Sequence, residues 1–209
     1  MAKRRNNVPK KIKETVLKEY KHKCAICGAN DPQLHHIDEN PSNNGIENLI
    51  PLCPNCHLKD QHNPTAGIDI GILKLFRKYK DPVILSHQFV PIYRRFNYLY
   101  DLKDEDNIDS VKGRTNELIG FIRHFGMGDF YAHQIERLLR DPINKLESIL
   151  NKPEVKLYGA NDKIKYVSEH YGILRENIEK AESLIVELLR YQNWIMPANY
   201  QLKLTARMG

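Results

Sequence analysis

The chain has 209 residues, of which 41% are hydrophobic, so it is long enough to bury the core of one ordinary domain and of a second, smaller unit. Nowhere does it approach the roughly eighteen apolar residues of a membrane span, and its basic first residues lack the apolar stretch of a secretory leader. We therefore expect a soluble, cytoplasmic protein with no membrane partner.

The formal net charge of +6 is unevenly distributed along the chain. Residues 1–23 hold nine Lys or Arg against two Asp or Glu, a net +7; residues 24–66 hold one against five, a net −4; residues 67–209 hold twenty-two against nineteen, a net +3. A basic arm of this kind either binds a polyanion or is a solvated tail, and charge alone leaves both open. The cations on which polyanion binding would depend are Lys3, Arg4, Arg5, Lys10, Lys11 and Lys13.

The first predicted elements are short. A proline typical of a helix start, followed by apolar residues at helical spacing, predicts a helix over about residues 9–20. Two apolar pieces, at residues 34–37 and 49–52, interrupt a stretch rich in Asn, Asp, Pro and Gly, and predict two short strands with a turn at residues 43–45. A short helix is expected over residues 57–61. The predicted order is strand, loop, strand, helix.

From about residue 67 onward, the pattern is that of long helices. Asp81-Pro82 and Asp141-Pro142 each combine a capping residue with a proline, so both predict helix starts and not helix interiors. The predicted fold class is α+β: a basic arm and lead-in helix over residues 1–23, a small mixed module over 24–66, and a mostly α-helical domain of unknown role over 67–209. The helices expected in that domain cover residues 70–80, 84–102, 111–125, 129–150 and 161–191.

All four cysteines fall in two C-x-x-C pairs, Cys24-Ala-Ile-Cys27 and Cys53-Pro-Asn-Cys56. In a reducing compartment such pairs favour metal-bound thiolates over disulfides, and their number and spacing suit tetrahedral Zn²⁺. Four protein ligands fill that coordination sphere and leave no place for substrate or water, so the zinc is predicted to be structural. Because a small, loop-rich module buries little apolar area, the metal is expected to supply much of its folding free energy.

Three histidines and an asparagine lie between and beside the cysteine pairs: the run Leu34-His35-His36-Ile37, then Asn48, then His57 directly after the last cysteine. In this arrangement the sequence resembles the HNH endonuclease family, with His36, Asn48 and His57 at the three positions that give the family its name. As in the four-cysteine branch of that family, the cysteine pairs flank the motif. The resemblance covers about residues 9–62 and says nothing about the remainder.

The resemblance implies a ββα-metal fold in which two strands and a helix hold one divalent ion. It implies that His36 is the general base, that His35 and His57 bind the ion, and that Asn48 holds the loop in place. Neighbouring side chains on a strand diverge, so one imidazole can bind the ion while the next stays free to take a proton from water. The ion is expected to be Mg²⁺, although imidazole ligands also suit Mn²⁺, Ni²⁺ or Zn²⁺.

One position departs from the family's pattern. Some members have a further histidine ligand four residues after the last lettered one, and here that residue is Gln61. Its neighbours His62 and Asp60 are candidates to replace it, as is water, and we favour His62.

The function that the resemblance implies is hydrolysis of phosphodiester bonds in DNA, with RNA also open as a substrate, leaving 5′-phosphate and 3′-hydroxyl ends. The implied setting is restriction, phage defence or a mobile element. The alternative is a non-catalytic zinc module that binds nucleic acid or a partner protein. Such a module has no need for an unmetallated histidine beside a metal-binding one, so His36 favours the enzyme.

The helical domain offers two further candidates for interaction. Basic and aromatic residues interleave around Arg77 and Lys78 and around Arg94 and Arg95, a pattern that can follow a phosphate backbone and stack bases. The alternative, which we favour, is that the aromatics form helix core and the cations a solvated face. A seam of apolar residues at helical spacing either packs inside this domain or binds a partner protein or a second copy; it consists of Ile178, Ala181, Ile185 and Leu188.

Overall fold

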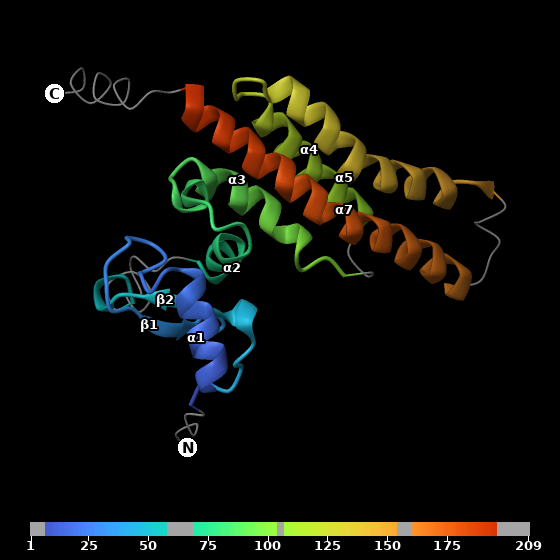
Figure 1. Ribbon diagram of the computed structural model, residues 1–209. Helices are drawn as coiled ribbons and strands as arrows, with labels where there is room; N and C mark the ends of the chain where they lie inside the picture. Colours follow the sequence, from blue (N-terminus) through green and yellow to red (C-terminus); the bar gives the residue numbers. More distant parts are fainter. Residues whose placement is uncertain (1–6, 58–68, 104–106, 154–159, 196–209) are drawn as a thin grey trace. The chain divides into compact units, whose positions relative to one another are not determined.

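The computed structural model describes residues 7–57, 69–103, 107–153 and 160–195 (Figure 1). The chain divides into two compact units, Met1–Leu85 and Ser86–Gly209, which we call the N-terminal unit and the helical unit. The division falls later than the expected boundary after residue 66, because the helix that begins at residue 70 belongs to the N-terminal unit. In the described part of the chain, no helix is both long and apolar enough to cross a membrane.

The N-terminal unit begins with helix α1 (Lys10–Glu19), which is followed by two antiparallel strands, β1 (Gln33–His36) and β2 (Leu49–Leu52). The 3₁₀ helix η1 (Ile46–Asn48) leads directly into β2. In the register of the pair, Gln33 lies opposite Leu52 and His36 lies opposite Leu49. All four residues of β2 are buried, so this strand forms much of the apolar centre of the unit. Together with the helices, this small sheet confirms the α+β class.

Helix α2 (Ile70–Tyr79) is capped by Asp69, whose side chain accepts a hydrogen bond from the backbone N–H of Gly71. Arg77 lies on the buried face of this helix, with 2% of its side chain exposed. Its Nη2 atom donates to Glu19 at 2.8 Å and to the backbone oxygen of Ile46 at 3.3 Å, which ties α2 to α1 and to η1. Arg77 therefore joins three elements of the unit, and its burial argues against both alternatives given by the sequence, a contact to nucleic acid and a cation on a solvated face.

The helical unit contains, among its described residues, helices α3 (Phe89–Phe96), α4 (Ile108–Ile122), α5 (Gly128–Leu150) and α7 (Ala160–Ile195), with a 3₁₀ helix, η4 (Asn97–Leu99), after α3. Helix α5 packs against both α4 and α7, and α3 packs against α4 (Figure 1). Ile178, Ala181, Ile185 and Leu188 are all buried. The apolar seam of α7 therefore packs inside the unit, which is the first of the two alternatives given by the sequence.

The single helix expected over residues 84–102 is wrong. The structure has instead the 3₁₀ helix η3 (Pro82–Leu85), a break, and then α3, which begins at Phe89. Pro91 explains the break, because it has no N–H and its ring would clash with the carbonyl four residues earlier in a continuous helix. The first turn of a helix tolerates a proline best, and α3 begins two residues before Pro91.

The helix start expected at Asp141-Pro142 is also wrong, because Pro142 lies inside α5 and is buried there. A proline inside a helix leaves the carbonyl four residues earlier without its usual N–H donor. That carbonyl belongs to Leu138, and the Nδ2 atom of Asn177 on α7 donates to it at 3.0 Å. A side chain from the neighbouring helix thus replaces the missing backbone donor, so the helix continues through the proline.

Candidate metal centre and histidine cluster

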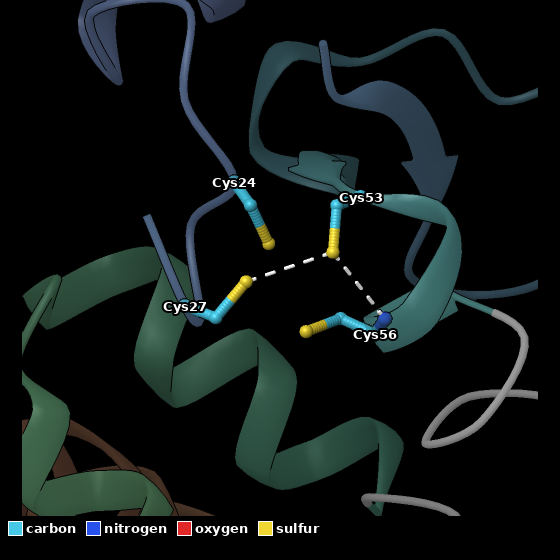
Figure 2. Close-up of side chains that lie close together, drawn as sticks. All are labelled: Cys24, Cys27, Cys53 and Cys56. Atoms are coloured by element: carbon cyan, nitrogen blue, oxygen red, sulfur yellow. Dashed lines mark hydrogen bonds between the residues drawn. The ribbon is translucent and has the colours of Figure 1, made fainter. Parts of the chain in front are cut away.

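Four sulfur atoms lie together in the N-terminal unit. The Sγ atoms of Cys24, Cys27, Cys53 and Cys56 are all within 4.8 Å of one another, and Figure 2 shows the side chains turned toward a common centre. Within the described residues, this is the one group of three or more His, Cys, Asp or Glu side chains at metal-binding spacing. None of the four cysteines forms a disulfide. The cluster can hold one metal ion, and four thiolates suit tetrahedral Zn²⁺.

The first cysteine pair lies in a tight turn after α1. The backbone N–H of Gly28 donates to the carbonyl of Cys24 at 2.9 Å, and Gly28 has a φ of +74°, which residues with a side chain rarely adopt. The N–H of Ala25 donates to the carbonyl of Pro51 at 2.8 Å. This bond fastens the turn to β2, and the second cysteine pair begins just after that strand.

The second pair begins directly after β2 with Cys53 and continues into a helical turn that contains Cys56 and His57. The N–H of Cys56 donates to the Sγ atom of Cys53 at 3.5 Å, and this bond, together with the neighbouring thiols, outweighs burial and lowers the pKa of Cys53 to about 7. Burial raises the pKa of Cys56. A backbone N–H that stabilises the Cys53 thiolate prepares this sulfur to bind a cation near neutral pH.

His35 and His57 come together from different elements. His35 lies on β1 with 5% of its surface exposed, and His57 lies on the helical turn after β2. Their ring centroids are 4.9 Å apart and their planes are inclined by 70°. Cys56, next to His57, directs its sulfur into the cysteine cluster (Figure 2). One helical turn therefore carries both a cysteine of the cluster and a histidine of the pair, because adjacent helical side chains point about 100° apart.

His36 has a different partner from its neighbour on β1. Its Nε2 atom is 3.0 Å from the Oδ1 atom of Asn44, in the loop between the two strands. Because an amide oxygen only accepts, the ring donates through Nε2–H, and a neutral imidazole then has its lone pair on Nδ1. Two consecutive imidazoles are thus divided by the alternation of the strand: His35 meets His57, and His36 meets Asn44.

Asn48 fastens the loop between the strands. Its Oδ1 atom accepts from the N–H of Asp38 at 3.0 Å, and its Nδ2 atom donates to Asp38 at 2.8 Å and to the carbonyl of Asn43 at 2.9 Å. Burial raises the pKa of Asp38, but hydrogen bonds from Asn43, from the backbone of Asn40 and from Asn48 outweigh burial and hold the pKa below its ordinary value of 3.8. Asp38 is therefore a carboxylate at neutral pH, and it gathers the donors that shape the loop.

A cavity of about 410 Å³ opens beside this loop. Its lining residues on the loop side are Asp38, Asn43, Glu47 and Asn48, and on α2 they are Lys74, Arg77 and Lys78.

The roles of Asn44 and Asp38 in the loop were not predicted from the sequence. Asn44 was read only as part of the Asn-Asn-Gly turn, and the position of Asp38 two residues after His36 was the available signal.

The other predicted contacts of the N-terminal unit lie on its surface where they are described. Lys10, Lys11 and Lys13 are exposed on α1, and Lys10 is 4.0 Å from Glu14. Lys78 is exposed on α2, with its Nζ atom 5.2 Å from the centroid of the adjacent tyrosine ring. The predicted residues outside the described part of the chain are Lys3, Arg4, Arg5, Asp60, Gln61 and His62.

No protein-family model, curated protein or solved structure matches this chain.

Proposed function

We propose that the N-terminal unit is a metal-dependent endonuclease of the HNH type that hydrolyses phosphodiester bonds of DNA. The observation that carries the proposal is the pairing of His35 with His57 while the adjacent His36 is held separately by Asn44. The cysteine cluster supports a structural zinc in the same unit, but it fits a non-catalytic zinc module equally well. The histidines distinguish the two functions.

The pair of His35 and His57 fits a shared divalent ion. Two imidazoles bound to one ion through bonds of about 2.1 Å, at the angle of roughly 90–110° that octahedral or tetrahedral coordination gives, have ring centroids on the order of 5 Å apart. The observed separation is 4.9 Å. When bound, Mg²⁺ or Mn²⁺ would act as a Lewis acid that stabilises the charge on the phosphoryl and leaving oxygens.

His36 would take the proton from the attacking water. Its bond to Asn44 leaves Nδ1 as the basic atom and fixes the plane of the ring. Asn48 in turn holds the loop that carries Asn44, through the backbone N–H of Asp38 and the backbone carbonyl of Asn43. The base is therefore positioned by amide side chains, and its imidazole does not have to bind the metal ion.

Exposed cations on α1 and α2 of the N-terminal unit favour a polyanionic substrate. Lys74 and Lys78 are exposed on α2 and line the cavity next to the loop, and Lys10, Lys11 and Lys13 are exposed on α1. Such side chains contact phosphates without reading bases, so they would position a DNA strand and leave the cleavage preference to other contacts. RNA remains the second substrate to test.

The test is incubation of the purified protein with supercoiled plasmid, single-stranded DNA and RNA, in Mg²⁺ or Mn²⁺. Cleavage by the wild-type protein should fall by about 10²- to 10⁴-fold in His36→Ala, because a general base is lost. The matched control is His133→Ala, which removes an exposed histidine from α5 and should cut at the wild-type rate. Wild-type cleavage of all substrates by His36→Ala would disprove the assigned base.

A second measurement separates the metal from the base. His57→Ala should weaken Mn²⁺ binding, followed by electron paramagnetic resonance, while the zinc content stays at one equivalent. His36→Ala should bind Mn²⁺ as the wild-type protein does. DNA binding without cleavage in any metal would instead support the non-catalytic zinc module.

A further inference from the structure

Helices α3 and α4 of the helical unit bring three arginines to one cavity of about 330 Å³. The residues that line it are Arg94, Arg95, Tyr98, Arg114 and Glu117. The sequence drew attention to Arg94 and Arg95 only, because Arg114 follows on another helix. A volume of this size is at the small end of the range for ligand sites.

Arg95, one of the residues that line this cavity, is held by three contacts. Its Nη1 atom donates to the carbonyl of Pro91 at 3.0 Å, its Nε atom is 3.1 Å from Glu117, and its guanidinium lies 4.2 Å from the centroid of the Phe121 ring. A planar guanidinium held against an aromatic ring loses little further freedom when it binds a ligand. Arg95 is thus more than a cation on a solvated face.

Tyr98 lies beside a second arginine of the lining, Arg114. The guanidinium of Arg114 lies 5.5 Å from the centroid of the Tyr98 ring, and the Tyr98 hydroxyl is 2.6 Å from the Oγ1 atom of Thr115. Burial raises the pKa of Tyr98 to about 12, so the phenol stays neutral and adds no negative charge to the cavity. Arg95 and Arg114 are therefore both held by contacts within the unit.

The charge of the cavity is not balanced by its own residues. Glu117 is the one acid in the lining, and it is paired with Arg95. Arg94 and Arg114 are exposed, and within the described residues no carboxylate forms an ion pair with either. Like charges gathered in this way repel one another, and a bound anion would relieve the repulsion.

We propose that this cavity binds a phosphate group, through the guanidinium groups of Arg94 and Arg114, which line it together with Arg95. Guanidinium groups present planar pairs of N–H donors that match two oxygens of a phosphate. The phosphate can belong to the backbone of a nucleic acid or to a free nucleotide, and the chemistry of recognition is the same. The inference concerns the helical unit and does not depend on nuclease activity in the N-terminal unit.

The test compares two double variants of the full chain. Arg94→Gln with Arg114→Gln removes two positive charges from the cavity, whereas Arg137→Gln with Lys145→Gln removes two exposed charges from α5 outside it. Binding is measured for ATP and pyrophosphate by calorimetry, and for a fluorescein-labelled DNA strand and its duplex by anisotropy. No divalent ion is added, so that cleavage cannot interfere.

The cavity variant should bind its phosphate ligand about tenfold more weakly, since two charge-assisted contacts are lost. The control variant should change the Kd by less than about twofold. Weakened binding of ATP alone identifies a free nucleotide as the ligand, weakened binding of pyrophosphate as well identifies the phosphate groups themselves, and weakened binding of DNA alone identifies the backbone. Equal weakening by both variants, or no effect of the cavity variant on any of the four ligands, would overturn the proposal.

A chemical readout on the wild-type chain guards against misfolding of the variants. Saturating ATP, pyrophosphate or DNA, whichever the binding measurements identify, should protect Arg94 and Arg114 from modification by phenylglyoxal, while the exposed Arg137 reacts as before. Equal reaction of all three arginines with and without ligand would count against the cavity.

Discussion

In the N-terminal unit, the chain from Lys21 to Asn48 is mostly loop, and thiols, amide side chains and a carboxylate fix its conformation. In the helical unit, by contrast, long helices bury rows of apolar side chains. On α5 such a row consists of Ile135, Leu139, Ile143 and Leu146. Loops can turn donor atoms from distant residues toward one point, whereas a regular helix cannot. The unit with the convergent thiols is therefore the one whose stability we expect to depend on a bound metal.

The largest expected effect is the loss of the metal from the N-terminal unit. Cys56→Ser removes one of the four clustered thiols, and binding of a structural zinc contributes roughly 10–16 kcal/mol to folding. Hydrogen exchange followed by mass spectrometry should therefore show loss of protection in α1, β1 and β2. The helical unit serves as the internal control, because its peptides should keep their protection.

Metal analysis completes this test. The wild-type protein should retain about one equivalent of zinc after dialysis, and the variant should not. A Cys56→Ser protein that kept native protection in β2 would show that the cluster does not hold the unit together.

The reciprocal change is Leu188→Ala in the helical unit. Leu188 is fully buried on α7, and truncation of such a side chain leaves a cavity that costs about 3 kcal/mol. Urea unfolding of the helical signal should shift to lower concentration, while the zinc content stays at one equivalent. A loss of zinc from this variant would mean that the two units are not independent in stability.

Local signals predicted the elements whose ends are set locally. The helix expected over residues 9–20 is observed as α1 (Lys10–Glu19), and the strand expected over 49–52 is observed as β2. The two cysteine pairs were predicted to form one cluster, and their sulfur atoms do lie together. Residue type and short spacing carry this information.

The errors arise where a distant partner decides. Pro142 looks like a helix start in the sequence, and only Asn177, 35 residues later, makes it acceptable inside α5. Arg77 looks like a surface cation in the sequence, but it is buried, and its guanidinium donates a hydrogen bond to Glu19 on another helix. The contact of His36 with Asn44 was likewise not predicted, because the conformation of the loop depends on bonds from Asn48 and Asp38.

The smallest expected effect tests the ion pair that joins α1 to α2. Glu19→Gln leaves the buried guanidinium of Arg77 with a neutral acceptor, and should cost about 1–2 kcal/mol. The estimate is kept low because 28% of the Glu19 side chain is exposed to screening by solvent. The matched control on the same helix is Glu14→Gln, whose carboxylate is 51% exposed and 4.0 Å from Lys10, and which should cost less than about 0.5 kcal/mol.

The pH dependence of this difference follows from the pKa of Glu19. Burial raises that pKa, but hydrogen bonds and charge from Arg77 and Lys80 outweigh burial and hold it below the ordinary value of 4.5. A carboxyl with a lowered pKa stabilises the folded state above its unfolded pKa, and this contribution is lost as the pH falls through the folded value. The difference between wild type and Glu19→Gln, measured by urea unfolding in excess zinc, should therefore stay constant from about pH 8 to about pH 5. A difference that changed within this range would assign the stabilisation to a group that titrates near neutrality. It would then show that the carboxylate of Glu19 is not what stabilises the buried Arg77.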